Sequence, residues 1–156
     1  MFRKMRRYKQ EIPQQECVDI LKKQPRGVLA VYGENGYPYA FPMDFIFMDE
    51  KVYFHCAKEG HKIDALAANN RVSFCVMDEG FRKEGEWPLN IKSIVIFGKV
   101  KRIDDPDEAL KITRQLGLKY YPTAESVEEE IRKAITKLLI MELSIEHMSG
   151  KLVNES

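Results

Sequence analysis

The sequence lacks the features of membrane, secreted and disulfide-stabilised proteins. No apolar run reaches the roughly 18 residues that a spanning helix needs, and the charged first residues have no apolar signal-peptide segment. Cysteine is scarce, because Cys17, Cys56 and Cys75 are the only three and form no Cys-x-x-Cys motif. We therefore expect reduced thiols and a cytoplasmic protein with no membrane partner.

Signatures of several enzyme classes are also missing. There is no GxGxxG motif and no Walker loop, which argues against a parallel nucleotide-binding architecture. No Ser/His/Asp order and no pair of carboxylates stands out, so catalytic residues stay unknown. His55, Cys56 and His61 are close in sequence but match no zinc spacing, and we expect no metal.

The composition is that of one globular domain, residues 1–156. The chain is 44% hydrophobic and 31% charged, with a net charge of +1 that gives no overall attraction to nucleic acid or membranes. Its first nine residues carry five bases and no acid. This basic arm, residues 1–12, could contact nucleic acid, but a solvated or dimer-packed arm is favoured and nucleic acid is not expected as a partner.

Alternating apolar residues predict a mainly β protein of the α+β class. The predicted strands are 27–32, 37–48, 51–57, 71–77, 93–100 and 139–145, followed by a polar tail over 147–156. Asn35-Gly36 and Asp49-Glu50 are typical of tight turns, so the first three strands should form an antiparallel meander. Pro38 and Pro42 lack an N–H group and indicate an edge strand or a bulge.

Helical patterns predict four helices around these strands. They cover residues 13–23, residues 61–69, a segment from Asp105-Pro106 to Gly117, and a segment opened by the capping-box pattern Ser126-Val-Glu-Glu129. Five or six antiparallel strands with helices outside indicate a small closed or split barrel.

The stretch "VYFHCAKEGHKIDAL" has features that suit an anion-binding site. A strand passes through Gly60 into a helix whose first turn carries His61 and Lys62. Unpaired N–H groups, the helix dipole and a lysine suit a phosphate group. The alternatives are an ordinary solvated helix start and a structural role for Asp64 as a cap or ion-pair partner. Nearby aromatic and thioether side chains suit a cofactor with a planar ring, although Phe41, Phe47 and Phe54 are better explained as core.

The chain resembles a known family along nearly its whole length. "VYFHCAKEGHKIDALAANNRVSFCV" resembles the flavin-binding segment of the pyridoxamine 5′-phosphate oxidase-like split barrels, in the branch related to nitroimidazole-resistance proteins. "MRRYKQEI", "YPYAFPMDFIF", "KSIVIFGKVKRIDD" and "LSIEHMSGK" agree in order. The resemblance implies a six-stranded antiparallel split β-barrel with flanking helices and FMN at a homodimer interface.

The resemblance also implies which residues hold FMN. His61 and Lys62 would bind the phosphate; many members have Arg-Lys there, so His61 is a weaker anchor. Residues 55–57 would line the ribityl and phosphate path, residues 42–45 would lie against the isoalloxazine ring, and residues 93–95 would approach it. The implied cofactor-binding set is Pro42, Met43, Asp44, Phe45, His55, Cys56, Ala57, Gly60, His61, Lys62, Ser93 and Val95.

One departure from the family narrows the expected activity. The C-terminal Trp and Arg motif of true pyridoxamine phosphate oxidases is missing, so we do not expect oxidation of pyridoxamine phosphate. The expected function is an FMN-dependent oxidoreductase that reduces a small organic acceptor such as a nitro compound or quinone. The alternative is a non-catalytic flavin- or haem-binding module, with His55 or His61 as a haem ligand. Trp87, in the loop 78–91, either covers the ring or substrate or plugs the barrel end.

Overall fold

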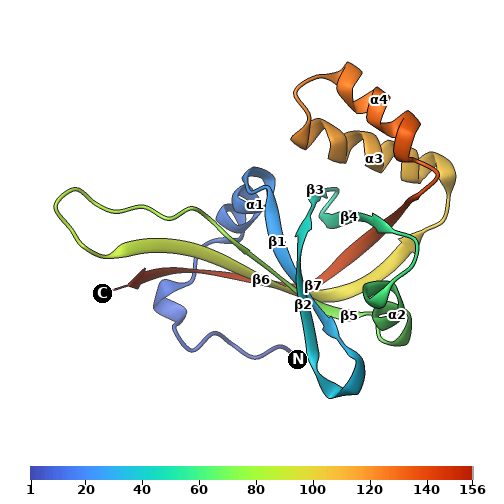
Figure 1. The fold of residues 1–156 in the computed structure, drawn as a ribbon. Helices are drawn as coiled ribbons and strands as arrows, with labels where there is room; N and C mark the ends of the chain where they lie inside the picture. Colours follow the sequence, from blue (N-terminus) through green and yellow to red (C-terminus); the bar gives the residue numbers. More distant parts are fainter. Residues whose placement is uncertain (156) are drawn as a thin grey trace.

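The computed structural model describes residues 1–155 and contains one curled antiparallel sheet flanked by helices (Figure 1). The seven strands are β1 (Arg26–Tyr32), β2 (Pro38–Asp44), β3 (Ile46–Met48), β4 (Lys51–Ala57), β5 (Arg71–Met77), β6 (Leu89–Ile103) and β7 (Leu138–Glu155). The helices are α1 (Gln14–Lys23), α2 (His61–Ala68), α3 (Pro106–Tyr120) and α4 (Ala124–Ala134), with short 3₁₀ turns at Tyr8–Gln10 and Glu34–Gly36. None of the helices in residues 1–155 has the length and apolar character needed to cross a membrane.

The predicted split-barrel fold is confirmed, with one strand more than the six expected. The extra strand arises because the predicted strand 37–48 breaks at Phe45. Its first half, β2, pairs with β1, and its second half, β3, pairs with β4. The sheet order is β2-β1-β5-β6-β7-β4-β3, so these two halves lie at opposite ends of the sheet. The chain at Phe45 therefore bridges the two edges and closes the curled sheet.

Local turn and edge signals in this region are confirmed. Asn35 and Gly36 have φ angles of 58° and 77°, and Asp49 and Glu50 have φ angles of 51° and 59°. These positive values are those required by tight hairpin turns. β2, which carries both predicted edge prolines, pairs only with β1.

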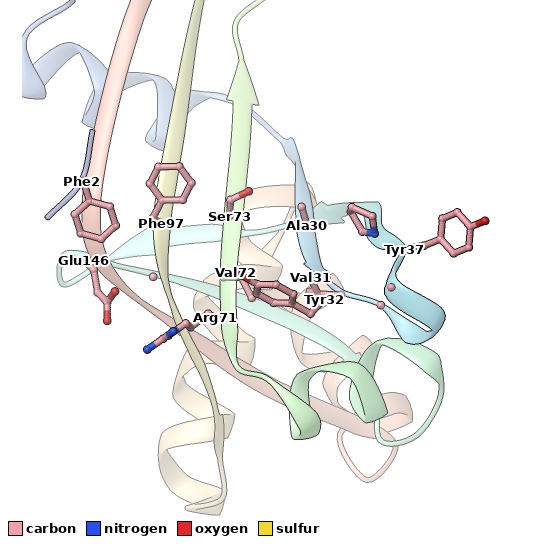
Figure 2. Close-up of a pocket in the computed structure, with 14 residues that line it drawn as sticks. Phe2, Ala30, Val31, Tyr32, Tyr37, Arg71, Val72, Ser73, Phe97 and Glu146 are labelled. Carbon is pink, nitrogen blue, oxygen red and sulfur yellow. The ribbon is translucent and has the colours of Figure 1, made fainter. Parts of the chain in front are cut away.

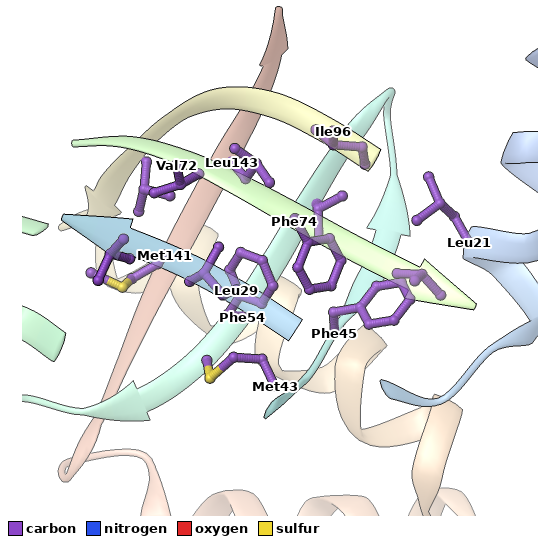
Figure 3. Close-up of a cluster of buried hydrophobic side chains, with 14 of the residues drawn as sticks. Leu21, Leu29, Met43, Phe45, Phe54, Val72, Phe74, Ile96, Met141 and Leu143 are labelled. Carbon is purple, nitrogen blue, oxygen red and sulfur yellow. The ribbon is translucent and has the colours of Figure 1, made fainter. Parts of the chain in front are cut away.

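Three aromatic rings fill the centre of the barrel (Figure 3). Phe74 makes edge-to-face contacts with both Phe45 and Phe54 at centroid separations of 5.1 Å, and all three side chains are fully buried. The predicted core role of Phe41 and Phe54 is thus confirmed, whereas Phe47 is only partly buried at the edge of this core.

The ends of the last two helices differ from the sequence prediction. α3 does not stop at Gly117 but continues to Tyr120. A Cβ atom on Gly117 would lie 2.8 Å from Val127 Cγ1, so this glycine permits close packing of α3 on α4 and does not end the helix. The N-cap of α4 is Thr123, three residues before the predicted cap Ser126, because the Thr123 hydroxyl accepts a hydrogen bond from the Ser126 N–H.

β6 and β7 form a ribbon longer than the sequence indicated. Residues expected as a polar tail continue β7 and pair along β6, as in the pair Ser93–Lys151. The N-terminal arm is also tied to this ribbon, since the buried Ile12 donates its N–H to the Gly150 carbonyl at 3.0 Å. Alternation of apolar residues could not reveal this extension, because the ladder is satisfied by main-chain groups whatever the side chains are.

Glu142 on β7 is a buried carboxylate, with only 2% of its side chain exposed. Its Oε1 lies 3.1 Å from Lys51 Nζ and 3.5 Å from Lys101 Nζ. Burial alone would raise the pKa of Glu142, but the hydrogen bond and ion pair with Lys51, helped by Lys101, outweigh it and lower that pKa.

Glu142→Gln is therefore expected to lower the free energy of unfolding at pH 7 by about 2 kcal/mol. The folded state stabilises the ionised form of Glu142 over the protonated form, so wild type should lose this advantage as pH falls through the lowered pKa of Glu142. Urea unfolding of wild type and variant between pH 3 and pH 7 measures this difference. One titrating group changes the free energy of unfolding by at most about 1.4 kcal/mol per pH unit. Glu146→Gln, which alters an exposed ion pair with Lys99, is the control; equal losses in both variants would contradict the prediction.

Candidate functional site

The β4–α2 junction presents an open helix N-terminus. Gly60 is the N-cap, with φ of 126°, and a Cβ atom built there would meet nothing within 4 Å. The Gly60 carbonyl accepts the N–H groups of Ile63 and Asp64, but residues 1–155 supply no acceptor for those of His61 and Lys62. No side chain caps the helix, so the alternative capping role of Asp64 is wrong. The junction therefore offers free donors at the positive end of a helix dipole.

Lys62, the second residue of α2, adds an ammonium group to this helix start. Its Nζ lies 3.8 Å from Met43 Sδ and 4.7 Å from the centroid of the Phe41 ring, so the side chain folds over β2. Within the described chain, no carboxylate lies within ion-pairing distance of it. His61 is exposed, and its ring stacks on Tyr39 at a centroid separation of 4.2 Å. Both predicted phosphate ligands are thus held against β2.

Asp44 and His55 lie on the strands β2 and β4 that flank the split. Asp44 Oδ1 accepts a hydrogen bond from Arg26 Nε at 2.7 Å. Burial lowers the pKa of His55, and the Lys62 charge acts in the same direction, although Asp44 opposes them. His55 is therefore neutral at pH 7, and it lines a cavity of about 140 Å³ beneath the α3–α4 hairpin.

Several predicted site residues have buried side chains. The Phe45 ring is fully buried, and Cys56 Sγ lies 3.8 Å from the Leu139 carbonyl oxygen and 3.7 Å from Met141 Sδ. Burial raises the pKa of the Cys56 thiol. Only the main chain of these two residues can reach a ligand, whereas Ala57 at the end of β4 is exposed.

Three of the remaining predicted residues, Pro42, Ser93 and Val95, lie on the outer face of the sheet, the side turned away from the aromatic core, whereas the Met43 side chain is buried in that core. Pro42, Val28, Cys75 and Val95 form one row of cross-strand neighbours on this face. Ser93 lies two residues from Val95 and shares its side. Three strand spacings, about 14 Å, separate Pro42 from Val95. Along the sheet of one chain, Ser93 and Val95 are therefore separated from Pro42 by two intervening strands.

A cavity of about 560 Å³ hollows the outer face next to this row (Figure 2). Its walls include Tyr32, Arg71 and Phe97, which the sequence did not single out. Alternation shows which residues of a strand share a side, but it does not show which strands are neighbours. The Phe2 ring of the basic arm stacks on Phe97, with centroids 5.7 Å apart and planes 3° apart, so the arm folds back onto this face.

Trp87 lies on the β5–β6 loop, which extends beyond the barrel (Figure 1). Its side chain is 87% exposed, and Arg82 Nε donates a hydrogen bond to its carbonyl at 3.0 Å. The alternative in which Trp87 plugs the barrel end is therefore wrong within this chain.

Comparisons with known proteins agree with this architecture. The family model described as pyridoxamine 5′-phosphate oxidase matches residues 13–152, and no curated protein matches. A candidate 5-nitroimidazole antibiotic resistance protein from Bacteroides thetaiotaomicron is 20% identical, with 92% of this chain and 87% of that chain covered and a TM-score of 0.76. A FAD-binding protein from Mesorhizobium loti is 24% identical, with 92% and 96% covered and a TM-score of 0.65.

A third solved structure, the FAD and heme binding protein from Mycobacterium smegmatis, is 23% identical, with 92% of this chain and 73% of that chain covered and a TM-score of 0.74. At these identities the three structures share the fold with this chain. They extend the similarity seen along residues 13–152 to the arrangement of the strands in space.

Proposed function

The chain belongs to the pyridoxamine 5′-phosphate oxidase family, and we propose that it is an FMN-binding oxidoreductase whose cofactor phosphate binds at the β4–α2 junction. One observation carries the proposal: the first turn of α2 has two free N–H groups and a lysine, Lys62, whose ammonium has no carboxylate partner in residues 1–155. A phosphate monoester, with a charge of about −1.5 to −2 at neutral pH, matches that set of donors.

The residues around the junction fit such a group. The exposed Gly60 lets a ligand approach the main chain, and the exposed His61 ring can add a hydrogen bond. Pro42 and Asp44, next to the split, would lie along the path from the phosphate to the flavin ring. This arrangement leaves the phosphate near solvent and the ring toward the outer face.

A second copy of the chain would complete the site. Along the sheet of one chain, Val95 lies about three strand spacings, about 14 Å, from Pro42, so these residues belong to different parts of the outer face. If two outer faces pack together, the partner can supply Ser93 and Val95 from its own β6. We therefore propose a homodimer with FMN at the interface, which would also cover the apolar outer face.

Bound FMN would supply the electron transfer, which explains why no catalytic dyad is needed. The chain's residues would bind and orient it: Lys62 and the α2 donors at the phosphate, and the outer faces excluding water from the ring. The missing Trp and Arg motif argues against pyridoxamine phosphate as substrate. A nitro compound or a quinone is the acceptor class we propose.

The absorption spectrum of the purified protein tests the cofactor. We expect flavin bands and a released chromophore identified as FMN; FAD must be assayed alongside, since the Mesorhizobium loti and Mycobacterium smegmatis proteins bind FAD. A colourless protein that takes up neither flavin would refute the proposal. Binding without turnover of nitro or quinone acceptors, under NADH or NADPH, would indicate a binding module. A Soret band would indicate haem, for which the His55 cavity of about 140 Å³ is too small.

A further inference from the structure

The break in the chain at Phe45 is held by side chains from α3. Phe45 lies outside both ladders, because β2 ends at Asp44 and β3 begins at Ile46. Its N–H donates to Tyr120 Oη at 2.8 Å, and its carbonyl accepts from Lys119 Nζ at 2.8 Å. These two side chains replace the hydrogen bonds that a neighbouring strand would otherwise provide.

The same two side chains also hold the junction between α1 and β1. Lys119 Nζ donates to the Gln24 carbonyl at 2.7 Å, and the Tyr120 hydroxyl lies within hydrogen-bond distance of the Pro25 carbonyl. Lys119 Nζ further lies 3.8 Å from the centroid of the Phe45 ring. The end of α3 thus joins two segments, each of which lies more than 70 residues before it in the sequence.

The break adjoins the proposed flavin site. Met43, which contacts Lys62, and Asp44, which pairs with Arg26, are the two residues before Phe45. We infer that Lys119 and Tyr120 are positioning residues for the FMN site, because they fix the strand break that sets where Met43 and Asp44 lie. The expected change in FMN binding rests on the proposed function. The expected change in the main chain at Phe45 does not.

The protonation states set the conditions for a test. Burial lowers the pKa of Lys119 to about 8, although Asp44 opposes it, and burial raises the pKa of Tyr120 to about 12. At pH 7 Lys119 is therefore mostly an ammonium and Tyr120 keeps its proton. Both side chains then have the donors that the contacts to Phe45, Gln24 and Pro25 use.

Two substitutions at pH 7 test the inference. Tyr120→Phe and Lys119→Met should each weaken FMN binding about three- to tenfold and speed hydrogen exchange of the Phe45 amide in the protein without flavin. Lys119→Arg, which keeps donors and charge, should restore most of the affinity. Tyr8→Phe and Lys111→Met, at exposed positions, are the matched controls.

The outcomes separate this inference from the proposed function. If wild type binds FMN and both variants bind it equally well, the positioning role is wrong. If wild type binds no flavin, the proposed function fails, and unchanged exchange of the Phe45 amide in the variants would then also show that Lys119 and Tyr120 do not hold the break at Phe45. Tyr120→Phe removes a single oxygen atom, so it keeps the test decisive even if Lys119→Met does not fold.

Discussion

Replacing Lys62 with glutamate is expected to weaken FMN binding at least about 100-fold while the protein stays folded. A hydrogen bond between an ammonium and a phosphate contributes about 1.5–3 kcal/mol, and the introduced carboxylate adds repulsion to the lost attraction. The fold should survive because Lys62 Nζ has no ion pair among the described residues and makes only a weak contact to Met43 Sδ and a cation–π contact to the Phe41 ring. Fluorescence titration with FMN measures the affinity, and circular dichroism checks the fold.

Lys58→Glu is the matched control for this substitution. It reverses the same charge in the exposed loop before α2, where the side chain is screened by solvent. We expect a change of less than about threefold there. Equal losses in both variants would point to a general effect of net charge, and unaltered binding in Lys62→Glu would show that the phosphate lies elsewhere.

The sequence predicted those elements whose boundaries are set by nearby residues. β4 and β5 were predicted with the observed ends, Lys51–Ala57 and Arg71–Met77, because turn residues or a helix start flank each apolar run. The break at Phe45 could not be predicted in this way. It depends on which sheet edges meet and on Tyr120, 75 residues further along the chain.

In the candidate site, too, the features that depend on neighbouring residues could be predicted and those that depend on tertiary structure could not. Gly60, His61 and Lys62 are neighbours in sequence, so their meeting at one helix start followed from local patterns. The burial of Phe45 and Cys56 follows from the core that forms around them. The separation of Val95 from Pro42 follows from the strand order β2-β1-β5-β6, which no local pattern contains.

The second large effect, a loss of dimerisation, is expected for a substitution on the outer face. Val28, at the centre of the row that joins Pro42 to Val95, is 43% exposed, and Met77 and Phe97 on neighbouring strands are 60% and 40% exposed. Val28→Asp should therefore leave the monomer folded but place a carboxylate in the proposed interface. In a two-fold symmetric dimer each protomer contributes one such carboxylate to the interface, so we expect dimerisation to weaken at least about 100-fold. Analytical ultracentrifugation measures it.

Leu118→Asp provides the control, since Leu118 on α3 is 45% exposed and lies outside the row from Pro42 to Val95. The decisive comparison is between Val28→Asp and Lys62→Glu. If the partner supplies Ser93 and Val95 to the flavin, Val28→Asp must lose FMN together with the dimer, whereas Lys62→Glu must lose FMN and remain dimeric. A Val28→Asp monomer that binds FMN as tightly as wild type would show that one chain completes the site without Ser93 and Val95 of a partner.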